Sequence, residues 1–220
     1  MVQQKTLRVK FEKTGKLQYI SHLDLLRTMQ TALRRSKVKM MYSEGFNPHM
    51  KITFALPLSI GTESVCEYMD IKVDESVKAD DVKANLSKNL PSDMKVVDVY
   101  EAQTKLTEVK FAEYTMYLDY GEKSEEAVRV GEKLFSGSLV VTKRTKKGDK
   151  EIDVSPMIKE ISCAYEYGVC VIKAKLSADS ENYLNPFYLT GALDTAMGGE
   201  AEHRRVVRME TYFADGKVFA

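Results

Sequence analysis

The sequence has no tryptophan and only three cysteines, and these cysteines are poorly placed for holding a metal. Cys66, Cys163 and Cys170 are an odd number, and no two of them form a C-x-x-C pair. An iron–sulfur cluster or a structural zinc ion requires closely spaced ligands. Each cysteine instead lies in an apolar, strand-like segment, which favours a buried free thiol. We therefore expect no metal, no iron–sulfur cluster and no other cofactor.

Long apolar runs are also absent. No stretch approaches the roughly 18 apolar residues that a membrane span requires. The opening residues, MVQQKTLRVK, lack the apolar segment of a signal peptide. With 44% hydrophobic residues, the 220-residue chain can still bury a substantial core. We expect a globular cytoplasmic protein without a membrane partner.

The net charge of +1 conceals an uneven distribution of charge along the chain. Basic residues greatly outnumber acidic ones over residues 1–53, and acidic residues outnumber lysines over residues 62–102. A nearly neutral chain can therefore present one basic face. Such a face suits phosphate groups or an acidic protein surface.

The first half of the chain has the pattern of a small α+β domain. Residues 6–12, TLRVKFE, alternate apolar and polar side chains as a half-buried strand does. Ser21 suits a helix N-cap, and apolar residues then recur at helical spacing to about residue 36. The other elements that we expect are strands at 51–56, 65–73 and 94–100 and a helix at 77–90. This β-α-β-β-α-β order predicts a ferredoxin-like domain over residues 1–104.

The same order is expected to recur over residues 105–220. The expected elements are strands at 111–120, 165–176 and 204–213, helices at 124–135 and 185–197, a hairpin at 139–154 and a short helical turn at 155–161. The overall prediction is an α+β fold of two tandem ferredoxin-like (βαββαβ) units with antiparallel sheets.

Several motifs of the first half resemble a known bacterial family. They are ISHLDLLR at 20–27, ALRR at 32–35, YSEGFNPH at 42–49, ALPL at 55–58 and GTES at 61–64. Together they resemble the radical-SAM-linked proteins, a family of unknown function, in its stand-alone form. The resemblance is most specific over residues 11–73 and continues more loosely to Arg208. It implies an accessory protein that works with a separate radical SAM protein in RNA or ribosome biology, and it assigns no catalytic residue.

The first candidate site combines the predicted helix at 21–36 with the loop at 42–49. Free amides at a helix start attract an anion, and aromatic side chains can stack on bases. If the loop before the second strand lies near the helix start, the two segments hold a phosphate and an adjacent base. The candidate residues for RNA or partner binding are Tyr19, Ser21, His22, Asp24, Arg27, Arg34, Arg35, Tyr42, Ser43, Gly45, Phe46, Asn47 and His49.

Three other interpretations of this region stay open. In the first, Ser21 and Asp24 cap the helix, the arginines complement its C-terminal dipole, and no ligand is needed. In the second, His22 and His49 act as general acid and base of a metal-independent endoribonuclease. The third is a metal site, which is disfavoured because His22 and Asp24 are two residues apart on a helix and so face different directions.

A second candidate lies in the predicted hairpin at 139–154. A phosphate backbone could lie along its basic side chains, and each contact would add a salt-sensitive contribution to affinity. A solvated, lysine-rich hairpin that discourages edge pairing explains the same composition. The basic candidates in this segment are Lys143, Arg144, Lys146, Lys147 and Lys150.

A weaker candidate is an open sheet face in the second half. Alternation over 165–176 predicts Tyr165 and Lys173 on the same side, with Arg208 and Tyr212 beside them, where bases could stack. Packing against the other domain would explain this face equally well.

Taken together, these patterns favour a non-catalytic accessory protein that binds structured RNA and cooperates with a radical SAM protein. An endoribonuclease, or a domain that only docks the radical SAM protein through its basic face, remains the alternative.

Overall fold

The computed structural model describes residues 3–145, 148–179 and 182–220. The chain divides into two compact units. Unit 1 extends to Glu108 and also includes Ala220, and unit 2 extends from Val109 to Phe219. Both units are mixtures of helices and antiparallel strand pairs, which confirms an α+β fold.

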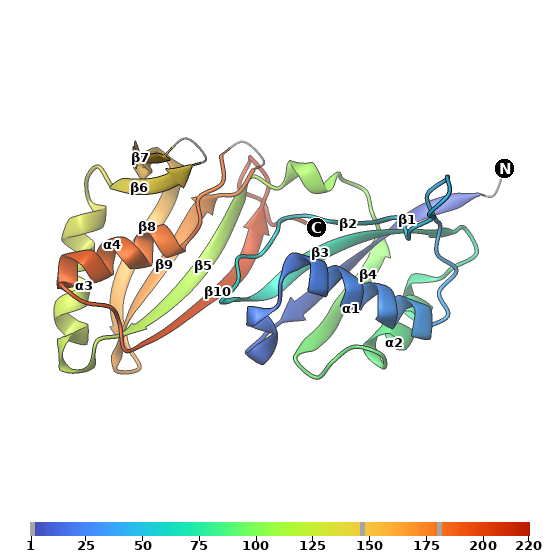
Figure 1. Cartoon of the computed structure of the whole chain (residues 1–220), viewed down its shortest axis with the longest axis horizontal. Helices are drawn as coiled ribbons and strands as arrows, with labels where there is room; N and C mark the ends of the chain where they lie inside the picture. Colours follow the sequence, from blue (N-terminus) through green and yellow to red (C-terminus); the bar gives the residue numbers. More distant parts are fainter. Residues whose placement is uncertain (1–2, 146–147, 180–181) are drawn as a thin grey trace. The chain divides into compact units, whose positions relative to one another are not determined.

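Unit 1 contains one antiparallel sheet. Strand β1 pairs with both β3 and β4, and the short β2 pairs with the other edge of β3, so the order is β4-β1-β3-β2. Figure 1 shows the helices and strands of this unit. Its elements are β1 (Gln4–Lys13), η1 (Gly15–Tyr19), α1 (His22–Arg35), β2 (Ile52–Phe54), β3 (Thr62–Asp74), α2 (Ala79–Ser87), β4 (Met94–Glu101) and η2 (Leu106–Glu108).

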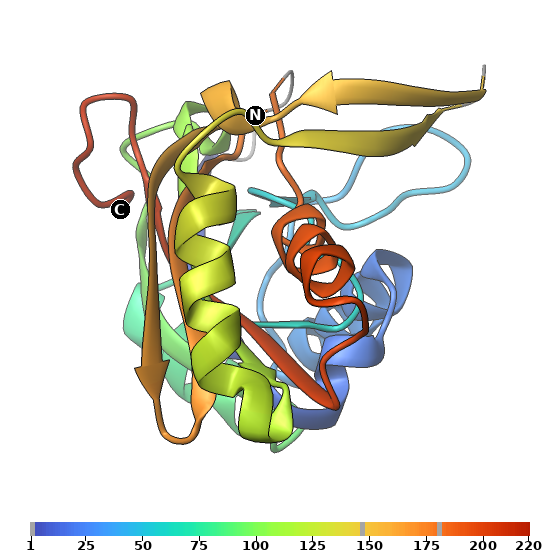
Figure 2. The same ribbon diagram turned by 90° about the vertical axis from the view of Figure 1, so that its left-hand side faces the viewer.

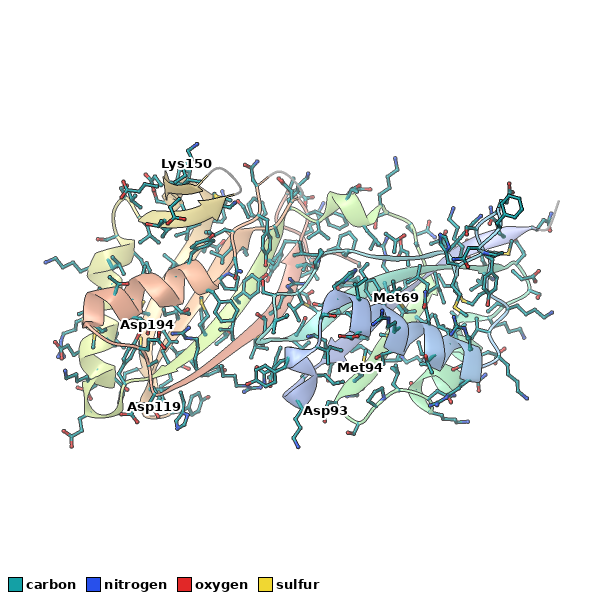
Figure 3. The ribbon with its side chains drawn as sticks, viewed as in Figure 1. Met69, Asp93, Met94, Asp119, Lys150 and Asp194 are labelled. Carbon is teal, nitrogen blue, oxygen red and sulfur yellow. The ribbon has the colours of Figure 1, made fainter. Side chains whose placement is uncertain are left out.

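The two faces of this sheet differ because side chains alternate along each strand. Leu7, Val9 and Phe11 of β1 point toward the helices and belong to the core, together with Leu25, Met29 and Leu33 of α1 and Val82 and Leu86 of α2. Figure 3 shows Met69 and Met94, the core methionines of β3 and β4. The opposite face carries Arg8, Asp70 and Lys72.

Unit 2 contains a second antiparallel sheet, in which β5 pairs with β10 and β9, and β9 pairs with β8. The order is therefore β10-β5-β9-β8. Strands β6 and β7 form a separate two-stranded sheet. The elements are β5 (Phe111–Asp119), η3 (Gly121–Lys123), α3 (Ser124–Phe135), β6 (Val140–Thr145), β7 (Gly148–Asp153), η4 (Ser155–Met157), β8 (Ile158–Glu166), β9 (Val169–Ser177), α4 (Phe187–Met197) and β10 (His203–Tyr212).

The β8–β9 hairpin differs from the sequence prediction. A helical turn was expected at 155–161 and one strand at 165–176, but the turn ends at Met157 and β8 begins at Ile158. The two strands are joined at Tyr167 and Gly168, whose φ angles are 55° and 81°. Two consecutive residues with positive φ are typical of a tight hairpin turn, but tyrosine rarely takes that conformation. The turn therefore has a weak sequence signal.

The β6–β7 hairpin lies outside the main sheet of unit 2. Figure 2 shows it extending away from the four-stranded sheet. Its base is attached through the buried Leu139, Val141 and Val154, and the amide of Val154 donates to the carbonyl of Leu139 at 2.8 Å. The hairpin is thus an addition between α3 and β8.

No helix in the described part of the chain combines the length and the apolar character that crossing a membrane demands.

Candidate functional site

The start of α1 is a fully formed helix cap. The hydroxyl oxygen of Ser21 accepts a hydrogen bond from the Asp24 amide at 3.2 Å, and the hydroxyl donates to Asp24 Oδ2 at 2.7 Å. Arg27 Nη1 lies 3.2 Å from Asp24 Oδ1. The bond from Ser21, and then that from Arg27, hold the pKa of the Asp24 carboxyl below its usual range. The predicted N-cap at Ser21 is confirmed, and capping accounts for Ser21 and Asp24.

His22 is the first residue of α1, and its side chain is exposed. Its ring meets Phe54, at the end of β2, edge to face with ring centroids 5.2 Å apart. Tyr19 and Leu23 beside it are 66% and 61% exposed. The surface at the helix start is therefore more apolar and aromatic than the sequence alone suggested.

The loop from Tyr42 to His49 is closed by its own hydrogen bonds. The Ser43 amide donates to the His49 carbonyl at 2.9 Å, and the His49 amide donates to Ser43 Oγ at 3.0 Å. His49 Nδ1 lies 2.9 Å from the Asn47 carbonyl, which can only accept, so Nδ1 is the donor in this contact. Between them, Gly45 has a φ of 116° and Phe46 is fully exposed. This closed loop presents one aromatic ring to solvent.

The structure does not bring His22 and His49 together. His22 begins α1, whereas the loop containing His49 comes after the end of α1 and before β2. A helix of 14 residues is about 21 Å long. In a β-α-β connection the chain returns along the helix, so the loop before β2 lies at the helix end. The expected single constellation is therefore corrected to two separate places, and a shared acid–base pair has no geometric support.

A groove lies along the polar face of α1. It has a volume of about 420 Å³, and four of its lining residues are Arg27, Thr28, Thr31 and Arg35 of α1. Arg27, Thr31 and Arg35 recur every four residues and so share one helix face, and Thr28 is adjacent to Arg27. Residues 89–91, which follow α2, form the other side of the groove. Arg34 is exposed but does not line the groove, which separates it from the other two arginine candidates.

The charge of this groove is only partly compensated. The Arg27 side chain is 74% exposed, and its guanidinium is paired with Asp24. Within the part of the chain that the structure describes, the Arg35 guanidinium has no hydrogen-bond or ion-pair partner. Thr28 donates its hydroxyl to the Asp24 carbonyl at 2.8 Å, which fixes its rotamer. The groove thus offers two cations and the hydroxyl of Thr31 to an incoming anion, because the Thr28 hydroxyl already donates its proton within the helix.

The basic hairpin forms as predicted, and its strands place like charges opposite each other. Lys143 of β6 is paired in register with Lys150 of β7, and both are exposed. Figure 3 shows Lys150 pointing outward. Like charges directly opposite each other destabilise a strand pair, so an anion between them would relieve a cost. Arg144 pairs with Asp149 in the backbone register, and Lys146 and Lys147 lie outside the described residues.

The open-face prediction for unit 2 is wrong for two of its residues. Arg208 is buried on the helix side, where its Nε donates to the Tyr114 hydroxyl at 3.2 Å. Tyr165 is in register with Cys170 and so faces the helix side as well. Tyr212 remains on the open face with the Lys175 ammonium 4.3 Å from its ring centroid. Residues 165–176 belong to two strands, β8 and β9, that are joined by a turn. The alternation of side chains between the two sheet faces therefore does not continue through this segment.

The cysteines have the environment of structural thiols. Cys66 and Cys170 are buried and Cys163 is partly buried, all as free thiols. Burial raises the pKa of Cys163 to about 12 and that of Cys170 to about 11. In the described residues, no group of three or more His, Cys, Asp or Glu side chains is placed to hold a metal ion.

The residues that sequence reasoning missed in the groove fall into two groups. Thr28 and Thr31 stand one and four positions after Arg27, so a helical projection of α1 could have found them. Residues 89–91 are far along the chain, and their place beside α1 depends on how α2 packs. No local signal in the sequence gives that contact.

The fold and this site define a two-unit α+β protein with an arginine-lined surface groove on its first helix. The chain belongs to the family described as "Uncharacterized protein conserved in bacteria (DUF2344)", whose model matches residues 6–186. No curated protein matches the sequence.

Several solved structures are distantly similar. One is a chain from the "Crystal Structure of a Cbf5-Nop10-Gar1 Complex", with 9% identity and a TM-score of 0.47 over 93% of this chain and 48% of that chain, so this protein spans about half of its length. Another is an unknown protein from Galdieria sulphuraria, with 14% identity, a TM-score of 0.28, and coverage of 89% and 91%. A third is the small subunit of acetolactate synthase from Thermotoga maritima, with 8% identity, a TM-score of 0.24, and 94% of each chain covered. These likenesses are too remote to support an inference about function.

Proposed function

We propose that this protein is a non-catalytic accessory protein that binds structured RNA through the α1 groove. The observation that carries the proposal is the placement of Arg27 and Arg35 in one groove, with hydroxyls between them. Arginine offers a planar fork of donors that matches a phosphate, and the hydroxyl of Thr31 adds a neutral donor. Two arginines two helical turns apart suit a backbone that presents successive phosphates.

Electrostatics favours an extended anion over a single small one. The groove is open and the Arg27 side chain is 74% exposed, so each contact to one phosphate is weakened by water and salt. Several weak contacts along one nucleic-acid backbone add up to useful affinity. The second candidate element, with Lys143 opposite Lys150, would contribute in the same way.

Phe46 supplies what the groove lacks, a surface for bases. It is fully exposed on a loop that Ser43 and His49 hold closed, so little conformational freedom is lost when a base stacks on it. Single-stranded loops of structured RNA present such unpaired bases. We therefore include the loop at 42–49 in the proposed RNA surface.

We also propose a radical SAM protein as the partner, working in the cytoplasm. This part is supported by the resemblance of the 20–27 and 42–49 motifs to radical-SAM-linked proteins. Tyr19 and Leu23, exposed at the start of α1, would suit protein docking because apolar and aromatic side chains dominate such contacts.

Each unit is proposed to be a ferredoxin-like domain. The strand orders β4-β1-β3-β2 in unit 1 and β10-β5-β9-β8 in unit 2 support this, since both are the order of a split βαβ arrangement. The hairpin β6–β7 is then an insertion in the second domain.

The test compares two variants of the full chain on a fluorescently labelled RNA hairpin at several salt concentrations. Arg27→Ala/Arg35→Ala should weaken binding by at least about tenfold and reduce the salt slope by about 2, because two phosphate contacts are lost. Arg34→Ala is the matched control, since it removes an exposed arginine of the same helix that does not line the groove. Equal effects of the two changes would show that the groove is not the RNA site.

A pull-down from cells separates this proposal from pure protein docking and from catalysis. RNA should be enriched with the chain when nuclease is omitted, and the radical SAM protein should stay bound after nuclease because Tyr19 and Leu23 contact it directly. Retention of that protein without any enriched RNA would favour pure protein docking. Intact RNA after prolonged incubation with purified protein is expected. Cleavage abolished by His22→Ala would instead favour the endoribonuclease alternative.

A further inference from the structure

The face of the unit 1 sheet that points away from α1 and α2 contains a pocket that no motif or spacing in the sequence predicts. Its volume is about 490 Å³, within the range of small-molecule sites. Three lysines and three threonines line it, and all belong to unit 1. They are Thr6, Lys51, Thr53, Lys72, Thr104 and Lys105.

Strand register explains why these side chains converge. Thr6 of β1 is opposite Lys72 of β3, and the Lys72 amide donates to the Lys51 carbonyl at 3.1 Å on the other side. The three residues form one row across the sheet, and alternation places them on the face away from the helices. Two lysines side by side across a strand pair repel each other. The repulsion between Lys51 and Lys72 destabilises this part of the sheet, and a bound anion would reduce it.

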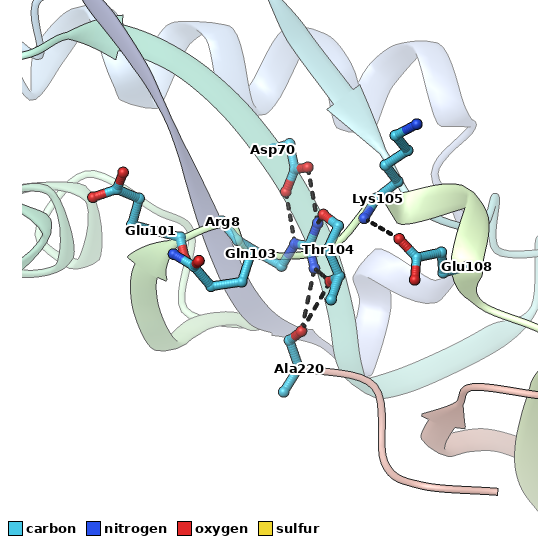
Figure 4. Close-up of polar contacts among 8 residues, drawn as sticks. All are labelled: Arg8, Asp70, Glu101, Gln103, Thr104, Lys105, Glu108 and Ala220. Carbon is cyan, nitrogen blue, oxygen red and sulfur yellow. Dashed lines mark hydrogen bonds and ion pairs between the residues drawn. The ribbon is translucent and has the colours of Figure 1, made fainter. Parts of the chain in front are cut away.

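Asp70 is the one carboxylate among the described residues that line the pocket, and the buried Arg8 guanidinium balances its charge. Asp70 accepts from Arg8 through both of its oxygens, at 2.8 and 3.0 Å. Arg8 also donates to Thr104 Oγ1 and to the Thr104 carbonyl, each at 2.7 Å, and Figure 4 shows these bonds. The network fixes the floor of the pocket. Its lysines are thus left with their positive charge uncompensated from within.

The lysine heads are available to a ligand. Among the residues that the structure describes, the ammonium groups of Lys51, Lys72 and Lys105 have no hydrogen-bond or ion-pair partner. In Figure 4 the Lys105 side chain extends away from the Arg8 network. The hydroxyl of Thr53, which is opposite Asp70 in register, adds a neutral donor on the same face. Cations beside hydroxyls are the donor set of a phosphate site.

We propose that this pocket binds a phosphomonoester, carried by a free mononucleotide or by the end of an RNA chain. A phosphomonoester bears close to two negative charges at neutral pH, whereas each internal phosphate of a nucleic acid bears one. Three lysines converging on one pocket match the more concentrated charge. The site is distinct from the α1 groove, because the sheet separates this face from the helices.

The free-nucleotide source is tested by titrating AMP into the full chain by calorimetry at low salt, with adenosine as the uncharged control. AMP should bind and adenosine should not. Lys51→Ala/Lys72→Ala should weaken AMP binding by roughly tenfold for each lysine removed. Lys95→Ala, which removes an exposed lysine of β4 outside the pocket, should leave it unchanged.

The RNA-end source is tested with one oligonucleotide carrying either a 5′-phosphate or a 5′-hydroxyl. Preference for the phosphate that is lost in Lys51→Ala/Lys72→Ala would assign the pocket to RNA ends. If the alanine variant is unfolded, Lys51→Gln/Lys72→Gln is tested in its place, because glutamine keeps most of the aliphatic part of each lysine and removes the charge. No binding of AMP and no preference for the phosphorylated strand, or binding unaffected by both variants, would overturn the proposal.

These results are separable from the test of the α1 groove. Arg27→Ala/Arg35→Ala leaves the pocket lining intact, so it should bind AMP as the unmodified chain does. Loss of AMP binding in that variant would mean that the phosphate is bound in the groove, and the pocket proposal would fail.

Discussion

Replacing Arg8 by methionine tests whether the buried network of unit 1 specifies and stabilises the fold. The Arg8 side chain is fully buried, and its guanidinium donates to both Asp70 oxygens, to both Thr104 oxygens and, at 3.4 Å, to the Ala220 carbonyl. Methionine fills much of the volume and provides no donor. Asp70 would then be a mostly buried carboxylate, 16% exposed, without a cation.

The expected loss in the free energy of unfolding is about 3 kcal/mol. Removing one partner of a buried pair costs about 3–5 kcal/mol, and water reaching the exposed part of Asp70 should keep the value near the lower end. Such a loss is a large fraction of the roughly 5–15 kcal/mol that stabilises a typical domain. Urea unfolding should show a lower midpoint with an unchanged slope.

A double-mutant cycle separates the ion pair from the loss of packing. Asp70→Asn should also destabilise, because it leaves the Arg8 charge uncompensated. The combination of Arg8→Met and Asp70→Asn should destabilise less than the sum of the two by at least about 1.5 kcal/mol. Additive effects, or a loss below about 1 kcal/mol for Arg8→Met, would refute the reasoning. Lys95→Met is an exposed control and should have little effect.

Three further outcomes are expected. Burial raises the pKa of Cys163 to about 12 and that of Cys170 to about 11. Ellman's reagent at pH 8 should therefore label these two thiols at least a hundredfold more slowly in the native than in the denatured protein. Rapid labelling of the native protein would contradict their burial. Hydrogen bonds from the Ser155 hydroxyl and amide, and to a smaller extent from Ser138, hold the pKa of Asp153 at about 2, below the unfolded value of about 3.9. The ionised Asp153 carboxylate therefore stabilises the folded protein above pH 4, and this contribution is lost as the pH falls toward 2. Amide signals of β6 and β7 followed by NMR should report this loss, and Asp153→Asn should remove it. Phe46→Ala should weaken RNA binding by about tenfold without changing the melting temperature, since the ring contributes stacking and no packing; a lower melting temperature would reveal a structural role.

Local signals in the sequence were sufficient for the first helix. Ser21 and Asp24 specify its start. Of the apolar residues expected on the buried face, Met29 and Leu33 are buried, whereas Leu23 is 61% exposed and Leu25 lies in the core instead. Such features depend on neighbours within one or two turns, so they can be read without knowing the fold. The alternating first strand is predictable for the same reason.

Features that depend on pairing between distant segments were not predictable. The Lys51–Lys72 neighbourhood requires the register of β2 on β3, which no single segment encodes. The β8–β9 turn depends on Tyr167 at a φ of 55°, a conformation that its residue type does not suggest. The separation of His22 from His49, by contrast, followed from the predicted order itself, because a β-α-β connection places those two positions at opposite ends of the helix.

The insertion of β6–β7 between α3 and β8 makes the hairpin an attachment point for engineering. The four strands of unit 2 pair without it, and the amide of Val154 already closes the base by bonding to the Leu139 carbonyl. Replacing the outer part of the hairpin, beyond the buried Val141, by a short turn, or by a fluorescent-label or affinity-tag sequence, should leave the β10-β5-β9-β8 sheet intact. The hairpin is thus a place where a reporter can be installed, and where related chains can differ in length, at little cost to the rest of the molecule.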